Sequence, residues 1–164
     1  MKYALTFTVL LLAIPASVSS AAEAPAAKPN VLFIAVDDLR PELGCYGETA
    51  IRSPNIDKLA SDGIRFERAY TTSPVCSTSR SAMMTGFHQN YIGANQHRTG
   101  KKKPLPYGIK PIPNLLKAAG YHTSLMIGKK TDCNFTTGEP LFMGKSWKER
   151  EEGQPFYVQA TFGG

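Results

Sequence analysis

Unbroken hydrophobic runs separate polar stretches of the chain and mark the strands that the sequence predicts. The run NVLFIAV at residues 30–36 is rich in Val and Ile and ends abruptly at two carboxylates. This pattern is typical of a parallel strand that is buried on both faces. Further strands are predicted over residues 121–127 and 154–162. Residues 64–70 alternate between apolar and polar side chains, so a strand is expected there as well.

Three segments between these strands carry helical signals. Helices are predicted over residues 53–62, 76–85 and 113–119, and a glycine follows each of them. The first begins with Ser53 as the expected N-cap and Pro54 in its first turn. Strands that alternate with helices predict an α/β fold, with a mostly parallel sheet flanked by helices. In such sheets, sites form beyond the carboxyl ends of the strands.

The two ends of the chain predict a leader and an incomplete domain. Residues 1–21 have the form of an export signal: Lys2 precedes the apolar run 3–16, and small residues follow. Residues 22–29 are an Ala/Pro linker, and 30–164 are expected to form the folded part. The last predicted strand has no helix after it, so we expect the sheet to be incomplete. The protein is predicted to be periplasmic or secreted, without a stable membrane anchor.

Composition and charge fit one exported domain with an anionic partner. The 164 residues are 42% hydrophobic, which suits a single globular domain. The net charge of +6 favours sulfated or phosphorylated sugars, nucleic acid or a membrane surface as partners. No nucleic-acid-binding motif is recognisable, so no nucleic-acid partner is expected. The basic run at residues 100–104 is interpreted as a solvated loop.

Three cysteines in an exported chain leave at least one outside any internal disulfide. Cys45 and Cys133 could pair, or both could remain small buried residues. Cys76 is then left over at the start of a predicted helix, where backbone N–H groups favour an anion. Arg80 lies one turn further on the same helical face. A structural cysteine is the alternative interpretation of Cys76.

Asp37 and Asp38 stand side by side at the end of the first predicted strand. Adjacent carboxylates near a buried strand are costly unless a positive charge lies between them. A hard cation such as Ca²⁺ or Mg²⁺ would supply it, because both prefer carboxylate oxygen. The alternative is that the two side chains cap the following turn or pair with Arg40.

Three stretches together resemble a known family. Residues 29–47, 53–70 and 73–86 are similar, in order and spacing, to the N-terminal part of formylglycine-dependent type I sulfatases, which belong to the alkaline-phosphatase-like superfamily. Residues 92–98 and 120–135 look like a branch of bacterial polysaccharide sulfatases, whereas the opening stretch also resembles iduronate-type sulfatases. The resemblance implies an alkaline-phosphatase-like fold and a catalytic domain of which residues 30–164 are the N-terminal part.

The resemblance also implies roles for the residues at the first strand end and the second helix. Asp37 and Asp38 match the aspartate pair that binds a divalent cation, usually Ca²⁺, with Mg²⁺ as the alternative. Cys76 matches the residue that is oxidised to formylglycine, whose hydrate is both the nucleophile and a metal ligand. Arg80 matches the arginine that stabilises this hydrate.

The substrate side of the site matches less closely. Lys129 or Lys130 matches a lysine that binds sulfate, and both stay open because the segment between Tyr121 and the lysine is a residue or two longer than usual. His97 resembles a histidine near the site, with a satisfied loop histidine as the alternative. Thr78 stands where the family motif usually has proline. Asp132 lies near the position of the histidine in the usual Gly-Lys-x-His motif.

The implied function is hydrolysis of a sulfate ester on a sulfated carbohydrate, with a formylglycine-generating enzyme as a partner during maturation. The 164-residue chain alone is expected to be inactive, because the resemblance places further ligands outside it. One alternative is a phosphoester or phosphonate hydrolase of the same superfamily. Another is a non-catalytic protein that binds sulfated glycans and keeps Cys76 as a thiol.

Overall fold

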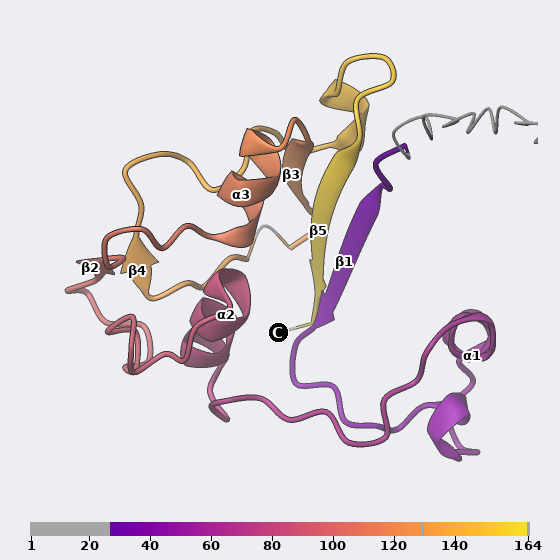
Figure 1. Ribbon diagram of the computed structural model, residues 1–164. Coiled ribbons are helices and arrows are strands. Elements are labelled where there is room, and N and C mark those ends of the chain that lie inside the picture. Colours follow the sequence, from indigo (N-terminus) through magenta and orange to yellow (C-terminus); the bar gives the residue numbers. More distant parts are fainter. Residues whose placement is uncertain (1–26, 129, 164) are drawn as a thin grey trace, which may run out of the picture.

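A three-stranded parallel sheet forms the centre of the computed structural model, which describes residues 27–128 and 130–163 (Figure 1). Strand β1 spans Val31–Val36, β5 spans Phe156–Phe162 and β3 spans His122–Met126. The strand order is β1-β5-β3. Both neighbouring pairs are parallel, so the prediction of an α/β fold with a parallel sheet is confirmed. The prediction that the first strand is buried on both faces is wrong. Strand β1 lies at the edge of the sheet, and Leu32, Ile34 and Val36 on one of its faces are 57%, 51% and 42% exposed.

The register brings the carboxyl ends of β1 and β5 to the same edge of the sheet. Val31 pairs with Tyr157, and Val36 pairs with Phe162 at the other end of the ladder. The ladder continues one step further, because the backbone N–H of Asp37 donates to the carbonyl of Phe162 over 2.8 Å. The side chains that follow β1 are therefore held at a fixed place on the sheet edge.

Two helices lie on one side of this sheet (Figure 1). Helix α2 spans Cys76–Thr85 and α3 spans Ile112–Ala118, close to their predicted bounds. Helix α2 ends at Gly86, whose φ of 71° is in the left-handed region that favours glycine. A hydrophobic core lies beside these helices, formed by Met84, Ile92, Ala94, Cys133 and Phe135.

Several short elements were not predicted. Strands β2 (Lys103–Pro104) and β4 (Phe135–Thr136) form a small parallel pair, so part of the basic loop is tied to the core segment. The 3₁₀ turn η2 (Trp147–Glu149) lies near the start of β5, where Trp147 stacks on Phe156 with ring centroids 6.2 Å apart. Two-residue strands have no sequence signal of their own, because their pairing depends on tertiary contacts.

Residues 39–72, here called the arm, extend away from the sheet (Figure 1). The arm holds the 3₁₀ turn η1 (Gly44–Tyr46) and helix α1 (Pro54–Asp62), which confirms the first predicted helix. Ser53 is the N-cap residue by position, but its hydroxyl accepts from the N–H of Gly44 over 2.9 Å. The side chain of Ser53 therefore ties η1 to α1, and it makes no capping bond within the helix.

The strand predicted over residues 64–70 is wrong. The segment has no ladder, and the carbonyl of Phe66 accepts from the hydroxyl of Tyr46 over 2.9 Å. Ile64 is 83% exposed and Tyr70 is 87% exposed. A strand needs a neighbouring strand for its backbone groups, and none lies beside this segment in the described part of the chain.

All three cysteines are free, so the pairing of Cys45 with Cys133 is excluded. Cys133 is buried in the core, where loss of hydration raises the pKa of its thiol to about 12.

The predicted export signal at 1–21 and the first residues of the predicted linker lie outside the residues that the structure describes. Along the residues that the structure describes, no helix combines the length and the apolar character needed to cross a membrane.

Candidate active site

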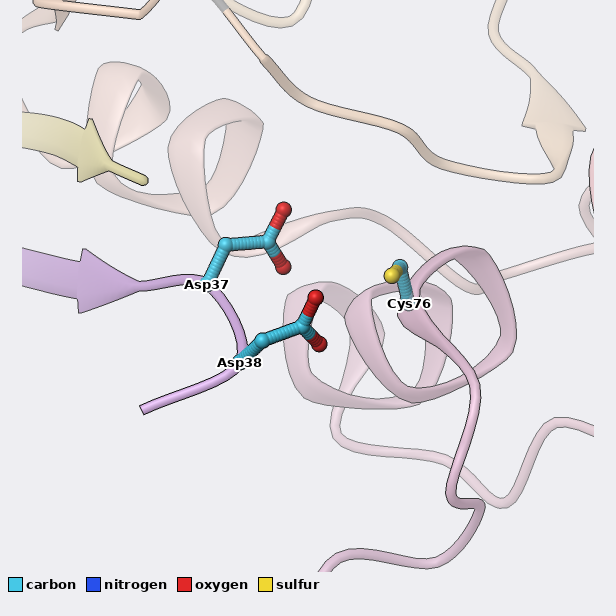
Figure 2. A group of neighbouring side chains, drawn as sticks. All are labelled: Asp37, Asp38 and Cys76. Atoms are coloured by element: carbon cyan, nitrogen blue, oxygen red, sulfur yellow. The ribbon is translucent and has the colours of Figure 1, made fainter. Parts of the chain in front are cut away.

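Asp37, Asp38 and Cys76 converge at the carboxyl edge of the sheet. One ligand atom from each of these side chains lies within 4.8 Å of the others. Figure 2 shows the two carboxylates, which follow β1, facing the sulfur of Cys76 at the start of α2. A hollow of about 240 Å³ opens between them, with Thr71 and Ser79 in its wall. The end of β1 at Val36 and the start of α2 at Cys76, 40 residues apart in the sequence, thus meet at one point.

The carboxylate of Asp37 is buried between two cationic side chains. Its side chain is 7% exposed, and Oδ1 lies 3.4 Å from Nη2 of Arg80, which is also buried. Nζ of Lys130 donates to the other oxygen of Asp37. The hydrogen bond from Lys130, aided by Arg80, lowers the pKa of Asp37 against the opposing effect of burial. Asp37 is therefore ionised at neutral pH.

Asp38 differs from its neighbour because it is exposed and has an unusual backbone. Its φ of 54° lies in the left-handed region, which turns the chain sharply after β1. Arg40 does not lie against either aspartate, because it is paired with Glu42 at 3.8 Å. The alternative interpretation, in which Arg40 neutralises the two carboxylates, is wrong.

The first turn of α2 accommodates Thr78 at the position where the family motif usually has proline. The hydroxyl of Thr78 donates to the carbonyl of Val75 over 2.8 Å and lies 2.6 Å from the hydroxyl of Ser73. Thr78 is 3% exposed. Its hydroxyl bonds fix the chain directly before Cys76, so the helix begins at the cysteine without proline.

Of the two lysine candidates, Lys130 lies in the site and Lys129 lies outside the described residues. The loop after β3 crosses the end of β5, where the N–H of Thr161 donates to the carbonyl of Ile127 over 3.2 Å. Gly128 permits this close approach: its φ is 71°, and an added Cβ would lie 2.4 Å from the carbonyl oxygen of Thr161. This crossing carries Lys130 to Asp37.

His97 lies beside the nucleophile candidate without contacting it directly. Its Nδ1 is 3.2 Å from the hydroxyl of Ser77, the residue after Cys76. The ring is exposed. The contact places His97 at the start of α2, and its hydrogen bond to Ser77 is also what a satisfied loop histidine would make.

A further ion pair was missed by the sequence analysis. Nε of Arg98 donates to Oδ1 of Asp132 over 3.0 Å, and Nη2 donates to Oδ2 over 2.9 Å. The hydrogen bond from Arg98 lowers the pKa of Asp132, which is therefore a carboxylate and not a proton donor at neutral pH. Oδ2 of Asp132 is also 3.9 Å from Nζ of Lys130. Arg98 lies in the stretch 92–98 and Asp132 in the stretch 120–135, both of which resemble the family. Their separation in the sequence does not predict that they form an ion pair.

Comparison with known proteins shows the family of the chain. A family model described as Sulfatase matches residues 29–157. The chain belongs to the sulfatase family. It is 32% identical over 149 residues to an ulvan-active sulfatase of Formosa agariphila, which covers 82% of this chain and 25% of that relative. It is 56% identical over 57 residues to human iduronate 2-sulfatase, covering 35% of this chain and 10% of the relative.

Two solved structures share the fold of this sulfatase-family chain. One is the structure of BT4656 in complex with its substrate D-glucosamine-2-N,6-O-disulfate, with a TM-score of 0.66, 20% identity, and coverage of 81% of this chain and 34% of that one. The other is the phosphonate monoester hydrolase of Agrobacterium radiobacter, with a TM-score of 0.57, 24% identity, and coverage of 82% and 26%. The chain spans about a quarter of the length of the first curated relative. Members of its family are sulfuric ester hydrolases.

Proposed function

We propose that the protein built on this chain removes sulfate from a sulfated carbohydrate, using a formylglycine made from Cys76 and a divalent cation. The observation that carries the proposal is the convergence of Asp37, Asp38 and Cys76 within 4.8 Å, with Arg80 and Lys130 on Asp37. The name of the Formosa relative and the sulfated sugar bound in the BT4656 structure support the substrate class.

The donor set fits a hard cation only in part while Cys76 is a thiol. The carboxylate oxygens of Asp37 and Asp38 suit Ca²⁺ or Mg²⁺, whereas the Cys76 sulfur is a soft ligand that these ions avoid. Conversion to hydrated formylglycine would replace this sulfur with oxygen, and all three residues would then fit Ca²⁺. When bound, the cation would neutralise negative charge on the sulfate oxygens.

The reaction divides a difficult displacement into two easier steps. One hydroxyl oxygen of the hydrate attacks sulfur as the bond from sulfur to the sugar oxygen breaks. The proton of that hydroxyl ends on the sugar oxygen, and the sugar leaves as an alcohol. The second hydroxyl then loses its proton, its oxygen forms the aldehyde double bond, and the carbon–oxygen bond to sulfate breaks. Water adds to the aldehyde and restores the hydrate.

The cationic side chains would stabilise the negative charge that develops on the hydrate and on the sulfate oxygens during this reaction. Arg80 is assigned to the hydrate, because it lies one helical turn from Cys76 on the same face of α2. Lys130 is assigned to the sulfate oxygens, with Lys129 as the other candidate and His97 as a more distant substrate contact. Positive groups fixed before substrate arrives stabilise charge in the transition state without reorganisation.

The remaining assignments follow from the same proposal. Residues 1–21 serve as an export signal and 22–29 as a linker, and 30–164 form the N-terminal part of the catalytic domain. The protein is exported to the periplasm or secreted, and a formylglycine-generating enzyme acts on it during maturation. We expect the 164-residue chain alone to bind Ca²⁺ weakly and to lack turnover, because three described donors are fewer than the six to eight oxygens that Ca²⁺ takes.

The decisive experiment is the mass of the tryptic peptide Ala69–Arg80 from protein purified out of its native cells. We expect the mass of an aldehyde at residue 76, with a Cys76→Ala variant as the control for the peptide assignment. An unmodified Cys76 that reacts with iodoacetamide would contradict the proposal and favour a glycan-binding protein. For converted protein, rates on an aryl sulfate and an aryl phosphate, measured side by side, then separate a sulfatase from a phosphoester hydrolase.

A further inference from the structure

The guanidinium of Arg98 is held along one edge only. Nε and Nη2 donate hydrogen bonds to the two carboxylate oxygens of Asp132, over 3.0 and 2.9 Å. Nη1 makes no hydrogen bond to any residue that the structure describes. The side chain of Arg98 is 52% exposed, whereas that of Asp132 is 12% exposed. The pair therefore presents a cationic edge to the solvent while its anionic half is covered.

The loop that carries Arg98 is fixed from both sides. The amide of Asn134, a buried residue, donates to the carbonyl of Gln96 over 2.5 Å and accepts from the N–H of Thr99 over 3.1 Å. The N–H of Arg98 itself donates to the hydroxyl of Ser77 over 3.0 Å. These contacts order the backbone on both sides of Arg98, so its guanidinium is presented in one position beside the first turn of α2.

The backbone at both members of the pair is unusual. Arg98 has a φ of 47° and Asp132 a φ of 51°, both in the left-handed region that non-glycine residues rarely adopt. Strained backbone of this kind tends to gather at binding and catalytic sites. Because Arg98 is half exposed, solvent screens this ion pair and its contribution to stability is small, so fold stability is a poor reason to hold two residues in this conformation.

We propose that Arg98 is a substrate-binding residue whose free guanidinium edge binds an oxyanion group of the sugar, with Asp132 as the residue that positions it. The inference rests on the proposed function, because Asp132 also approaches Lys130, the lysine assigned to the sulfate, at 3.9 Å. A planar guanidinium matches the paired oxygens of a sulfate or carboxylate, and a half-exposed one binds them from solvent without displacing Asp132. The group bound is either the sulfate to be cleaved or a second anion on the same sugar.

Calorimetric titration of the purified protein with three probes tests the inference. The probes are inorganic sulfate, D-glucosamine 6-O-sulfate and D-glucosamine-2-N,6-O-disulfate. The Arg98→Ala variant should bind the disulfated sugar at least about tenfold more weakly, the scale of charged hydrogen bonds. Arg150→Ala, which removes an exposed arginine at η2, is the matched control and should bind as the wild type does. Circular dichroism and the urea midpoint verify that each variant is folded.

The pattern across probes identifies the anion, and a double-mutant cycle tests the positioning role. Weaker binding of all three probes assigns Arg98 to the sulfate to be cleaved, and weaker binding of the disulfated sugar alone assigns it to the second anion. Asp132→Asn should weaken binding in the wild type but add nothing to Arg98→Ala. Equal binding by Arg98→Ala and Arg150→Ala overturns the inference, while loss of binding in Lys130→Ala would still support the proposed function. Failure of the wild type to bind any probe overturns both.

Discussion

The site and the arm differ in how far apart in the sequence their contacting residues lie. At the site, charged side chains from distant parts of the chain interlock: Asp37 contacts Lys130, 93 residues away, and Arg98 contacts Asp132, 34 residues away. In the arm, the contacts are short in sequence. The N–H of Cys45 donates to Asp57, 12 residues on, over 2.7 Å. Helix α1 thus packs against η1 and not against the sheet (Figure 1).

Exposure divides the two regions in the same way. Asp37 and Arg80 are charged yet more than nine-tenths buried, whereas Leu59 and Phe66 of the arm are apolar and each 68% exposed. Charged side chains are normally exposed and large apolar ones buried, which is the reverse of what is seen here. The buried charges at the site are therefore stabilised by pairing with one another. The polar cluster is thus held by ion pairs between distant parts of the chain, while the arm takes its shape from local hydrogen bonds. Four expectations test this difference.

Among the charged residues of the site and the arm, the largest effect is expected from Asp37→Ala. Removing this carboxylate leaves Arg80 and Lys130 close together without a counter-charge, so the variant should lose about 2–3 kcal/mol of unfolding free energy. The loss is at the low end for a buried pair because Lys130 is 26% exposed. Urea unfolding in the presence of EDTA measures it without any contribution from bound cation.

The matched control for that variant lies in the arm. Asp62→Ala removes an aspartate that pairs with Lys58 at 2.8 Å on the surface of α1. An exposed pair at this spacing contributes at most about 0.5 kcal/mol. Equal losses in the two variants would show that the Asp37 cluster is no more stabilising than a surface pair, and the comparison would fail.

A somewhat smaller effect is expected from Gly128→Ala. The new Cβ would lie 2.4 Å from the carbonyl oxygen of Thr161, and the residue would keep a left-handed φ of 71°. We expect a loss of about 1–2 kcal/mol and a displaced Lys130. Gly138→Ala is the control, because its Cβ would have open space. A fully stable Gly128→Ala protein would mean that the crossing over β5 does not fix the lysine.

The sheet layer carries signals in its sequence that the contacts between distant loops do not. The strands and helices of the sheet layer were predictable because hydrophobic runs and terminal glycines are local signals, as at β1 and α2. Asp37 and Asp38 were singled out because they follow a predicted parallel strand, and Cys76 because it begins a predicted helix. The resemblance to a known family joined them into one site, and the structure places the three side chains within 4.8 Å of one another. These predictions needed no knowledge of the tertiary structure.

The residues that were missed or wrongly assigned depend on contacts across the chain. Nothing in the spacing of 98 and 132 indicates that Arg98 pairs with Asp132, since tertiary packing brings together two loops that are 34 residues apart. Residues 64–70 alternate as a strand does, but alternation shows the faces of a segment and not whether a partner strand exists. The position of Lys130 beside Asp37 likewise depends on the crossing at Gly128, which no local signal predicts.

The pH dependence of stability should separate the two regions further. The pKa of Asp37 is lowered in the folded state, mainly by Lys130, so its stabilising effect is present above its unfolded pKa of about 3.9 and is lost as pH falls through the folded value. Unfolding free energy should therefore fall on acidification below about pH 5. Asp37→Asn should flatten this fall. Parallel pH profiles for the wild type and Asp37→Asn would contradict the assignment.

The smallest effect is expected from Leu59→Ala in α1. Leu59 is 68% exposed, so truncating it should change the unfolding free energy by no more than about 0.5 kcal/mol. Met84→Ala, in the core beside α2, should cost about 2–5 kcal/mol, because Met84 is 6% exposed and its removal leaves a cavity. Thermal and urea unfolding of both variants give the contrast directly. If Leu59→Ala costs as much as Met84→Ala, the apolar side chains of the arm are packed in solution, and the arm is held by burial as the sheet layer is.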